Sequence, residues 1–280
     1  TVAAVDYPGY GLSDGSPTEE GCYRNVHRLY DWLVETRGFK PEDIIVDGFS
    51  IGTGPATELA ATRPCGGLIL EAPFLSLVVS GGHTMFVDVK DYTRMEILGG
   101  TLDDAAGECF DKAARVLGLP YPGGKPMDEL AQQSQGGKYD LPRAHVNGAE
   151  LDMSFSGLKT ASLNLIHNAQ QKGEELDLPS FAASFGRAVS ESLVPRVMAA
   201  ARMKGYGKIA VAGGVAANSR IRADLEAACA ASGDKLYLPE LKYCGDNGAM
   251  IGCQGYYEYL AGKRADLDLN AYATRDISLG

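Results

Sequence analysis

Several pairs of adjacent glycines in this 280-residue sequence stand close to carboxylate or amide side chains. Two glycines after a strand let the backbone turn sharply and bring its N–H groups close to a ligand, commonly a phosphate. Aspartate side chains accept hydrogen bonds from ribose hydroxyls. The pattern therefore predicts a nucleotide held between loops. The glycine pairs are Gly81-Gly82, Gly123-Gly124 and Gly213-Gly214, and the nearby side chains are Asp111, Asp128, Asn218 and Asp246.

The first glycine pair has the clearest context. The apolar run from Leu75 to Val79 is typical of a buried strand, and it ends abruptly in Ser80-Gly81-Gly82. Two glycines after a strand are also a common plain turn, and each aspartate taken alone is also explained as a helix cap or a solvated surface group. These simpler interpretations stay open beside the nucleotide site.

A second candidate for chemistry is Ser50, within Gly48-Phe49-Ser50-Ile51-Gly52. This G-x-S-x-G pattern lies between a predicted strand and a predicted helix, where a nucleophile elbow is found, and its glycines allow the strained turn. A serine nucleophile without its histidine base loses most of its catalysis. The histidines further along the chain lie in sequence with a different pattern of residues. The alternative is therefore a turn with the shape of a nucleophile elbow but without catalytic activity. These histidines are His83, His145 and His167.

Strands alternate with helices in the first 74 residues. This alternation predicts right-handed crossovers and a parallel sheet, which would keep an unpaired, apolar edge. We expect strands at Thr1–Asp6, Ile44–Val46 and Gly67–Leu70, and helices at Glu19–Thr36 and from about Gly52 to Thr62.

The remaining sequence also mixes short strands with helices. Thr101 is a good N-cap candidate for a helix that runs to about Leu117, because acidic residues follow it in the first turn. Further helices are expected around Asp128, up to about Gln171, from about Pro179 to Lys204 and up to about Ala261. Strands are expected at Thr84–Lys90, Tyr92–Leu98, Ile209–Ala212 and Leu236–Leu238.

The composition limits the binding partners and the cellular compartments that are expected for this protein. The net charge of −10 argues against a broad basic face for nucleic acid and leaves room for a local patch. The 6 cysteines form no C-x-x-C pair, so reduced thiols and a cytoplasmic location are expected. The longest uncharged run, Ala72–Val87, is too short to span a bilayer, so we expect no membrane contact. The chain opens on Thr1, inside a strand pattern, as a cut N-terminus would.

Residues 1–74 resemble a fragment of the α/β-hydrolase superfamily of serine hydrolases. The resemblance rests on Asp6-Tyr-Pro-Gly-Tyr-Gly-Leu-Ser-Asp-Gly-Ser-Pro-Thr-Glu-Glu-Gly and on Gly67-Leu-Ile-Leu-Glu-Ala-Pro-Phe. It implies an esterase or thioesterase with Ser50 as its nucleophile. The oxyanion-hole loop of the superfamily precedes this segment and the triad Asp and His follow it, so neither has a counterpart in the sequence.

Residues 75–280 resemble the C-terminal two-thirds of the TsaD family of bacterial tRNA threonylcarbamoyladenosine transferase subunits, whose fold is that of actin, Hsp70 and sugar kinases. The resemblance implies an α/β chimera, in which an actin-like lobe follows a partial α/β-hydrolase β-α-β-α-β unit. The motifs that carry it are Val78-Val-Ser-Gly-Gly-His-Thr, Thr101-Leu-Asp-Asp-Ala-Ala-Gly-Glu, Phe110-Asp-Lys, Tyr121-Pro-Gly-Gly, Ser154-Phe-Ser-Gly-Leu-Lys-Thr, Val211-Ala-Gly-Gly-Val-Ala-Ala-Asn and Asp246-Asn-Gly-Ala-Met-Ile.

This second resemblance implies an activity and a binding site. The family transfers a threonylcarbamoyl group from threonylcarbamoyl-AMP to the exocyclic amine of the tRNA adenosine beside the anticodon. The glycine-rich loop would cradle the phosphate region of the adenylate or ATP ligand, and the aspartates and the amide would hold ribose and adenine. On this sequence the substrate-binding positions are Val78, Val79, Ser80, Gly81, Gly82, Asp111, Gly124, Asp128 and Asn218.

The resemblance also implies an iron or zinc ion, with Asp246 as one ligand, and partner subunits of the bacterial threonylcarbamoyladenosine complex. The other metal ligands of the family form a His-x-x-x-His pair, and this sequence has no two histidines at that spacing. Since catalytic zinc uses about three protein ligands, we expect no tight metal binding and an impaired transferase. A non-catalytic binding module is the remaining alternative.

Overall fold

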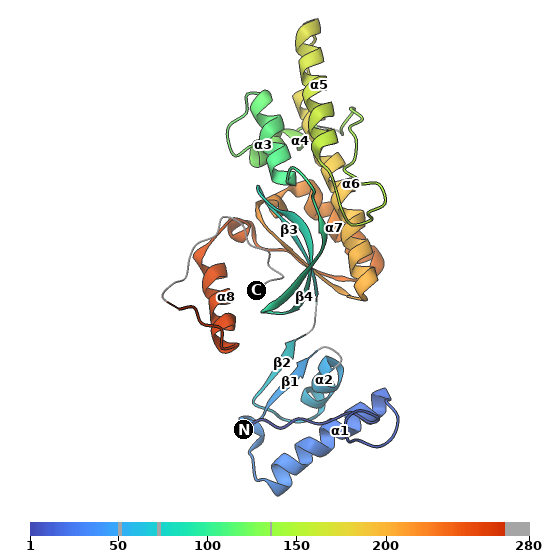
Figure 1. The fold of residues 1–280 in the computed structure, drawn as a ribbon, viewed down its shortest axis with the longest axis vertical. Coiled ribbons are helices and arrows are strands. Elements are labelled where there is room, and N and C mark those ends of the chain that lie inside the picture. The colour runs from blue at the N-terminus through green and yellow to red at the C-terminus, as the bar shows by residue number, and fades with distance from the viewer. Residues whose placement is uncertain (50–51, 72–73, 135, 267–280) are drawn as a thin grey trace. The chain divides into compact units, whose positions relative to one another are not determined.

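The computed structural model describes residues 1–49, 52–71, 74–134 and 136–266. The chain divides into two compact units, Thr1–Pro73 and Phe74–Gly280, termed unit 1 and unit 2 (Figure 1). Each unit has a hydrophobic core of its own, so each is described by itself.

Unit 1 contains a two-stranded parallel sheet and the helices α1 and α2. The predicted crossover is confirmed, because α2 joins the two strands, which pair with Ile45 opposite Gly67. Helix α1 begins after Thr18, whose hydroxyl accepts a hydrogen bond from the Gly21 amide at 3.1 Å. The elements are α1 (Glu19–Asp31), a π-helical turn (Trp32–Thr36), a 3-10 turn (Pro41–Asp43), β1 (Ile45–Phe49), α2 (Thr53–Thr62) and β2 (Gly67–Glu71).

The core of unit 1 is small. The Tyr30 hydroxyl donates to the Pro64 carbonyl at 2.5 Å, and the His27 Nε2 atom lies 2.7 Å from the Glu58 carboxylate, which joins α1 to α2. The apolar side chain of Ile69 on β2 is exposed. The buried side chains of this core are Tyr30, Val46, Ala56 and Leu59.

The strand predicted at Thr1–Asp6 is wrong: the structure has no strand there. A strand needs a partner for its backbone groups, and β1 pairs only with β2 within the described residues. Asp6 instead has no regular structure, and its carbonyl accepts hydrogen bonds from the Ser13 hydroxyl at 2.8 Å and the Asn25 side-chain amide at 3.0 Å.

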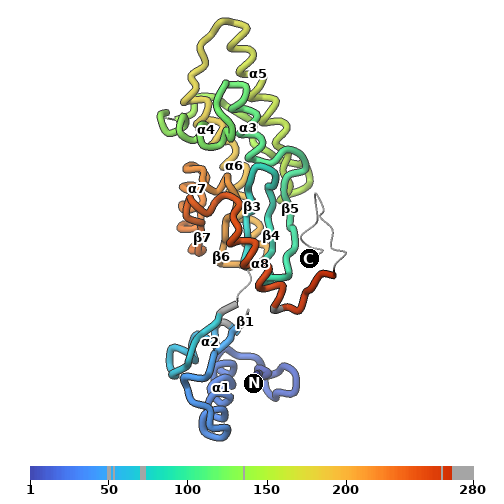
Figure 2. The backbone as a smooth tube through the Cα atoms, turned by 90° about the vertical axis from the view of Figure 1, so that its left-hand side faces the viewer, coloured from blue at the N-terminus to red at the C-terminus, as the bar shows by residue number. Residues whose placement is uncertain are grey.

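Unit 2 contains a five-stranded mixed sheet in the order β5-β4-β3-β6-β7 (Figure 2). The first three strands form an antiparallel meander behind the glycine turn, as expected, whereas β6 and β7 run parallel to β3. The strands are β3 (Phe74–Val79), β4 (Thr84–Asp91), β5 (Arg94–Gly100), β6 (Lys208–Ala212) and β7 (Lys235–Tyr237).

Helix α6 contributes many of the buried side chains in the core of unit 2. Its apolar side chains at four-residue spacing, Phe181, Phe185, Val189, Leu193 and Val197, are fully buried. Across the described ranges, every helix is too short or too polar to span a bilayer. The helices are α3 (Ala106–Val116), α4 (Gly124–Ala131), α5 (Ser156–Lys172), α6 (Leu178–Lys204), the 3-10 turn η4 (Gly214–Ala217), α7 (Ser219–Ser232), the 3-10 turn η5 (Leu241–Tyr243) and α8 (Gly248–Leu260).

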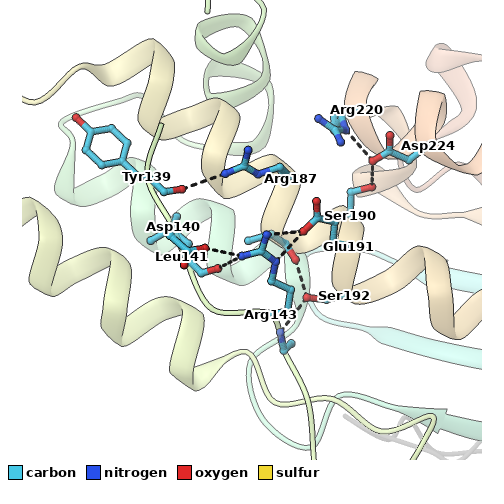
Figure 3. Close-up of polar contacts among 12 residues, drawn as sticks. Tyr139, Asp140, Leu141, Arg143, Arg187, Ser190, Glu191, Ser192, Arg220 and Asp224 are labelled. Atoms are coloured by element: carbon cyan, nitrogen blue, oxygen red, sulfur yellow. Dashed lines mark hydrogen bonds and ion pairs between the residues drawn. The ribbon is translucent and has the colours of Figure 1, made fainter. Parts of the chain in front are cut away.

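Serines of α6 hold the loop that leads from α4 toward α5. Three backbone amides of this loop donate to serine hydroxyls at 2.8–3.0 Å, and the Arg143 guanidinium binds the carboxylates of Asp140 and Glu191 (Figure 3). The hydroxyls supply acceptors that the loop backbone would otherwise lack. The pairs are Lys138 with Ser180, Tyr139 with Ser184 and Ala144 with Ser192.

The helix expected from Thr101 begins only at Ala106, and Thr101 is not its N-cap. The Thr101 hydroxyl donates to the Asp104 carbonyl at 2.7 Å instead. The Asp103 carboxylate accepts a hydrogen bond from the Phe155 amide at 2.8 Å, so this acidic residue binds the segment before α5. These distant contacts keep residues 101–105 out of the helix.

Candidate nucleotide-binding site

Strand β3 ends in the predicted glycine turn, which a serine side chain closes. The Ser80 hydroxyl accepts hydrogen bonds from the amides of Gly82 at 3.3 Å and His83 at 3.0 Å. The Ser80 amide donates to the His83 carbonyl at 2.7 Å. Gly81 and Gly82 are exposed, so a ligand can approach the backbone closely at this turn.

Two further glycines let other segments approach the turn. The Gly107 amide, in the first turn of α3, donates to the Ser80 carbonyl at 3.2 Å, and a Cβ on Gly107 would lie 2.5 Å from that oxygen. Gly213 has a φ of +104°, and its Cβ would lie 2.3 Å from the Val79 carbonyl oxygen. The start of α3 and the end of β6 therefore both meet the end of β3.

Asp111 on α3 fixes the start of α4. Its carboxylate accepts a hydrogen bond from the Gly123 amide at 2.7 Å. A Cβ on Gly123 would lie 2.3 Å from the Ala114 Cβ atom, so glycine allows this turn to pack tightly on α3. Gly124, a predicted substrate-binding residue, follows as the first residue of α4.

Asp128 on α4 contacts the start of α7. Its carboxylate accepts hydrogen bonds from the Ser219 hydroxyl at 2.8 Å and from the Ser219 amide at 3.2 and 3.3 Å. Asn218 caps α7, because its Oδ1 atom accepts from the Ile221 amide at 3.1 Å. Within the described residues, Oδ1 is the only side-chain atom of Asn218 that is engaged.

The structure thus links the elements that carry most of the predicted positions through a series of contacts. Helix N-termini and glycine turns favour phosphate groups, and carboxylate and amide side chains suit ribose and base. This arrangement is chemically suited to a nucleotide. The linking contacts are Val79 with Gly213, Ser80 with Gly107, Asp111 with Gly123, and Asp128 with Ser219.

An ionic cluster before α3 was missed by the sequence analysis. The Asp104 carboxylate pairs with the ammonium groups of Lys112, at 2.6 Å, and Lys159. Partial burial alone would raise the pKa of Asp104, but the hydrogen bonds from the two lysines hold it below its usual value. These three residues belong to the motifs on which the family resemblance rests. The sequence therefore contained them, but it did not indicate that they form ion pairs with one another.

Asp246 takes part in none of the linking contacts named above. Asp246 is exposed, and in the described part of the chain no three His, Cys, Asp or Glu side chains gather closely enough to hold a metal ion. The described residues therefore do not fit the iron or zinc site that the resemblance implies. Ser50 lies outside the described residues.

Comparison with known protein families connects the chain with an enzyme family. The family model of TsaD, tRNA N6-adenosine threonylcarbamoyltransferase, matches residues 58–253, more than half of the chain. The match begins inside α2, ahead of the position 75 expected from the sequence.

Curated relatives with that name give the same result. The protein of Clostridium botulinum is 48% identical over 202 residues, and that of Moorella thermoacetica is 50% identical over 202 residues. Both alignments cover 72% of this chain and 59% of the relative. The chain therefore spans about three fifths of the length of these relatives.

Solved structures support the fold class. Full-length HypF in its phosphate- and nucleotide-bound form superposes with a TM-score of 0.51 at 12% identity, covering 90% of this chain and 43% of HypF. HypF of T. kodakarensis gives a TM-score of 0.50 at 15% identity, covering 85% of this chain and 43% of its own. At such identities the likeness concerns the fold alone.

Proposed function

This chain belongs to the TsaD family of tRNA N6-adenosine threonylcarbamoyltransferases, and on that premise we propose that it binds the adenylate part of threonylcarbamoyl-AMP in the candidate nucleotide-binding site. The supporting observation is a series of contacts between the elements that carry the site. The turn at Ser80 contacts the start of α3, Asp111 on α3 contacts the start of α4, and Asp128 on α4 contacts the start of α7, beside Asn218. In this assignment the glycine turn faces the phosphate, and the aspartates and the amide face ribose and adenine.

We further propose that the chain takes part in transfer of the threonylcarbamoyl group to a tRNA adenosine in the cytoplasm. In that reaction the exocyclic amine bonds to the carbamoyl carbon, the bond from this carbon to the phosphate oxygen breaks, and the amine loses a proton. The adenylate-binding residues would hold the departing AMP. The net charge of −10 favours tRNA contact through a local patch or through partner subunits of the complex.

The sharpest test is the substitution Asn218→Asp. Aspartate caps a helix as well as asparagine does, so α7 keeps the hydrogen bond from the Ile221 amide. The change replaces an N–H donor by a charged oxygen that repels an adenylate. We expect the dissociation constant for AMP, measured by titration calorimetry, to rise about tenfold or more while the far-UV circular dichroism spectrum is unchanged.

Asn168→Asp is the matched control, since it adds the same charge at an exposed position of α5. Its affinity for AMP should equal that of the parent chain. A parent chain that binds no AMP contradicts the proposal, and equal affinity in the Asn218 variant removes that residue from the site.

AMP binding without transfer to tRNA, with partner subunits present, identifies a non-catalytic binding module. Iron and zinc content of the same sample tests the expected lack of tight metal binding.

We propose serine hydrolysis at Ser50 as a second candidate function. The G-x-S-x-G stretch begins with the last two residues of β1 and ends directly before α2, which is the strand-to-helix position of a nucleophile elbow. A Cβ on Gly48 would lie 2.5 Å from the Ala56 Cβ atom and 2.6 Å from the Gly52 carbonyl oxygen, so this position requires glycine. A fluorophosphonate probe should label the parent chain and not Ser50→Ala. An unlabelled parent chain removes this candidate.

A further inference from the structure

We propose that Ser219 is a positioning residue, which orients the Asp128 carboxylate to accept a hydrogen bond from a ribose hydroxyl. The proposal deepens the proposed function and rests on it, because the ribose belongs to the bound adenylate. Ser219 was not among the residues predicted from the sequence. Its contact with Asp128 joins two residues that lie 91 positions apart in the chain.

The Asp128 carboxylate is held at both of its oxygens. The Ser219 hydroxyl donates to Oδ1 at 2.8 Å, and the Ser219 amide lies 3.2 Å from Oδ1 and 3.3 Å from Oδ2. Gln132, directly after the last residue of α4, donates to Oδ2 at 3.0 Å. Donors on both oxygens restrict rotation of the carboxylate, so its orientation is set before any ligand arrives.

These contacts leave room for a ligand. An ionised carboxylate offers about four acceptor positions, and three donor groups use about three of them. Asp128 is partly exposed, so one further hydroxyl can reach it. The amide of Ser219 belongs to the first turn of α7, where the helix dipole favours a negative charge. The arrangement therefore matches one hydroxyl donor of a ribose.

The hydroxyl and the amide of Ser219 can be separated by mutation. Alanine and threonine at position 219 both retain the backbone amide, and Asn218 continues to cap α7. Ser219→Ala therefore removes only the hydroxyl bond at 2.8 Å, whereas Ser219→Thr keeps a hydroxyl. Without that bond the carboxylate turns more freely, and the hydrogen bond to ribose loses its alignment. The bonds to phosphate and base are unaffected.

The test is the preference for AMP over its deoxy analogues. AMP, 2′-deoxy-AMP and 3′-deoxy-AMP are titrated calorimetrically into the full chain and its variants. The parent chain should bind AMP about tenfold more tightly than one of the two analogues, as loss of a hydrogen bond to a charged group predicts. Ser219→Ala should reduce this preference to below about threefold, and Ser219→Thr should restore it.

Ser232→Ala is the matched control. Ser232 is the last residue of α7, and its hydroxyl contacts the Asp234 carboxylate at 2.5 Å, so its loss should leave the preference unchanged. Equal weakening of all three ligands by Ser219→Ala would show a general structural role and overturn the proposal. A parent chain that binds AMP without distinguishing the analogues would also overturn it, while leaving the proposed function standing. A parent chain that binds none of them overturns the proposed function itself.

Discussion

Asp88 illustrates how a charged side chain in the interior of unit 2 is paired with other polar groups. This carboxylate on β4 is 1% exposed, and it pairs with the Lys204 ammonium at 3.0 Å and accepts a hydrogen bond from the Tyr206 hydroxyl at 2.7 Å. A buried charge is tolerated only with such partners. The contacts attach the C-terminal end of α6 to the sheet.

The Tyr206 hydroxyl should make stability depend on pH in the alkaline range. Burial, together with the hydrogen bond to Asp88, raises the pKa of Tyr206 from 10.0 to about 12. Its stabilising effect is therefore complete below pH 10 and is lost as the pH rises from 10 toward 12, where the unfolded chain releases the proton more readily. Tyr206→Phe should lower the free energy of unfolding by about 1–2 kcal/mol at pH 8.

Urea unfolding at pH 8 and pH 11 checks this expectation. The difference between the parent chain and Tyr206→Phe should shrink at the higher pH. Tyr243→Phe, at an exposed position of η5, is the control and should behave like the parent at both values. A difference that stays constant with pH would contradict the assigned role.

At the scale of elements, polar side chains as well as apolar ones join α6 to its surroundings. Three serine hydroxyls of the helix accept hydrogen bonds from the loop at residues 138–144. The Ser190 hydroxyl donates to Asp224 on α7 at 2.6 Å (Figure 3). Each bond satisfies a group that packing removes from water. The helix therefore fixes both a neighbouring helix and a segment without regular structure.

Ser192→Ala should show how much one of these hydrogen bonds contributes to the free energy of unfolding. Ser192 and Ala144 are buried, and the substitution leaves the Ala144 amide without the acceptor it has at 2.8 Å. The free energy of unfolding should fall by about 2 kcal/mol, measured by urea denaturation. Ser232→Ala, at an exposed position of α7, should change it by less than about 0.5 kcal/mol. Similar values for the two variants would show that the buried hydroxyl bond has no special importance.

At the scale of the whole molecule, the two units differ in the size of their cores. Unit 1 buries a few side chains between two helices and two strands, whereas the core of unit 2 extends over β3, β4, α3, α6 and α7. Stabilisation grows with the apolar area removed from water, at about 25 cal/mol per Å². Unit 1 is therefore expected to be the less stable part.

Trp32 allows this difference to be measured. It is the only tryptophan of the chain and lies in unit 1, where the Arg37 guanidinium stands 5.1 Å from the centre of its ring. Tryptophan fluorescence should report an unfolding midpoint at lower urea than far-UV circular dichroism, to which the helices of unit 2 contribute strongly. Trp32→Phe should abolish the fluorescence transition and leave the main circular dichroism transition in place. Coincident transitions would contradict two independently stable units.

The sequence by itself determined those elements whose signal lies within a few neighbouring residues. The helix start at Glu19, the helix from about Pro179 to Lys204 and the glycine turn after β3 all have this property. The family resemblance of the second part was also contained in contiguous motifs, and the family match confirms it. The resemblance of the first part to hydrolases stays a prediction.

Only the tertiary structure decided features that depend on partners far apart in the chain. A strand at Thr1–Asp6 was excluded because β1 pairs with β2 alone in the described part of the chain. The start of α3 was moved by contacts between Asp103 and Phe155. The bond between Ser219 and Asp128 was equally invisible in sequence. Hydrogen-bond partners are selected in space, after the chain has folded back on itself, so local propensity and periodicity do not specify them.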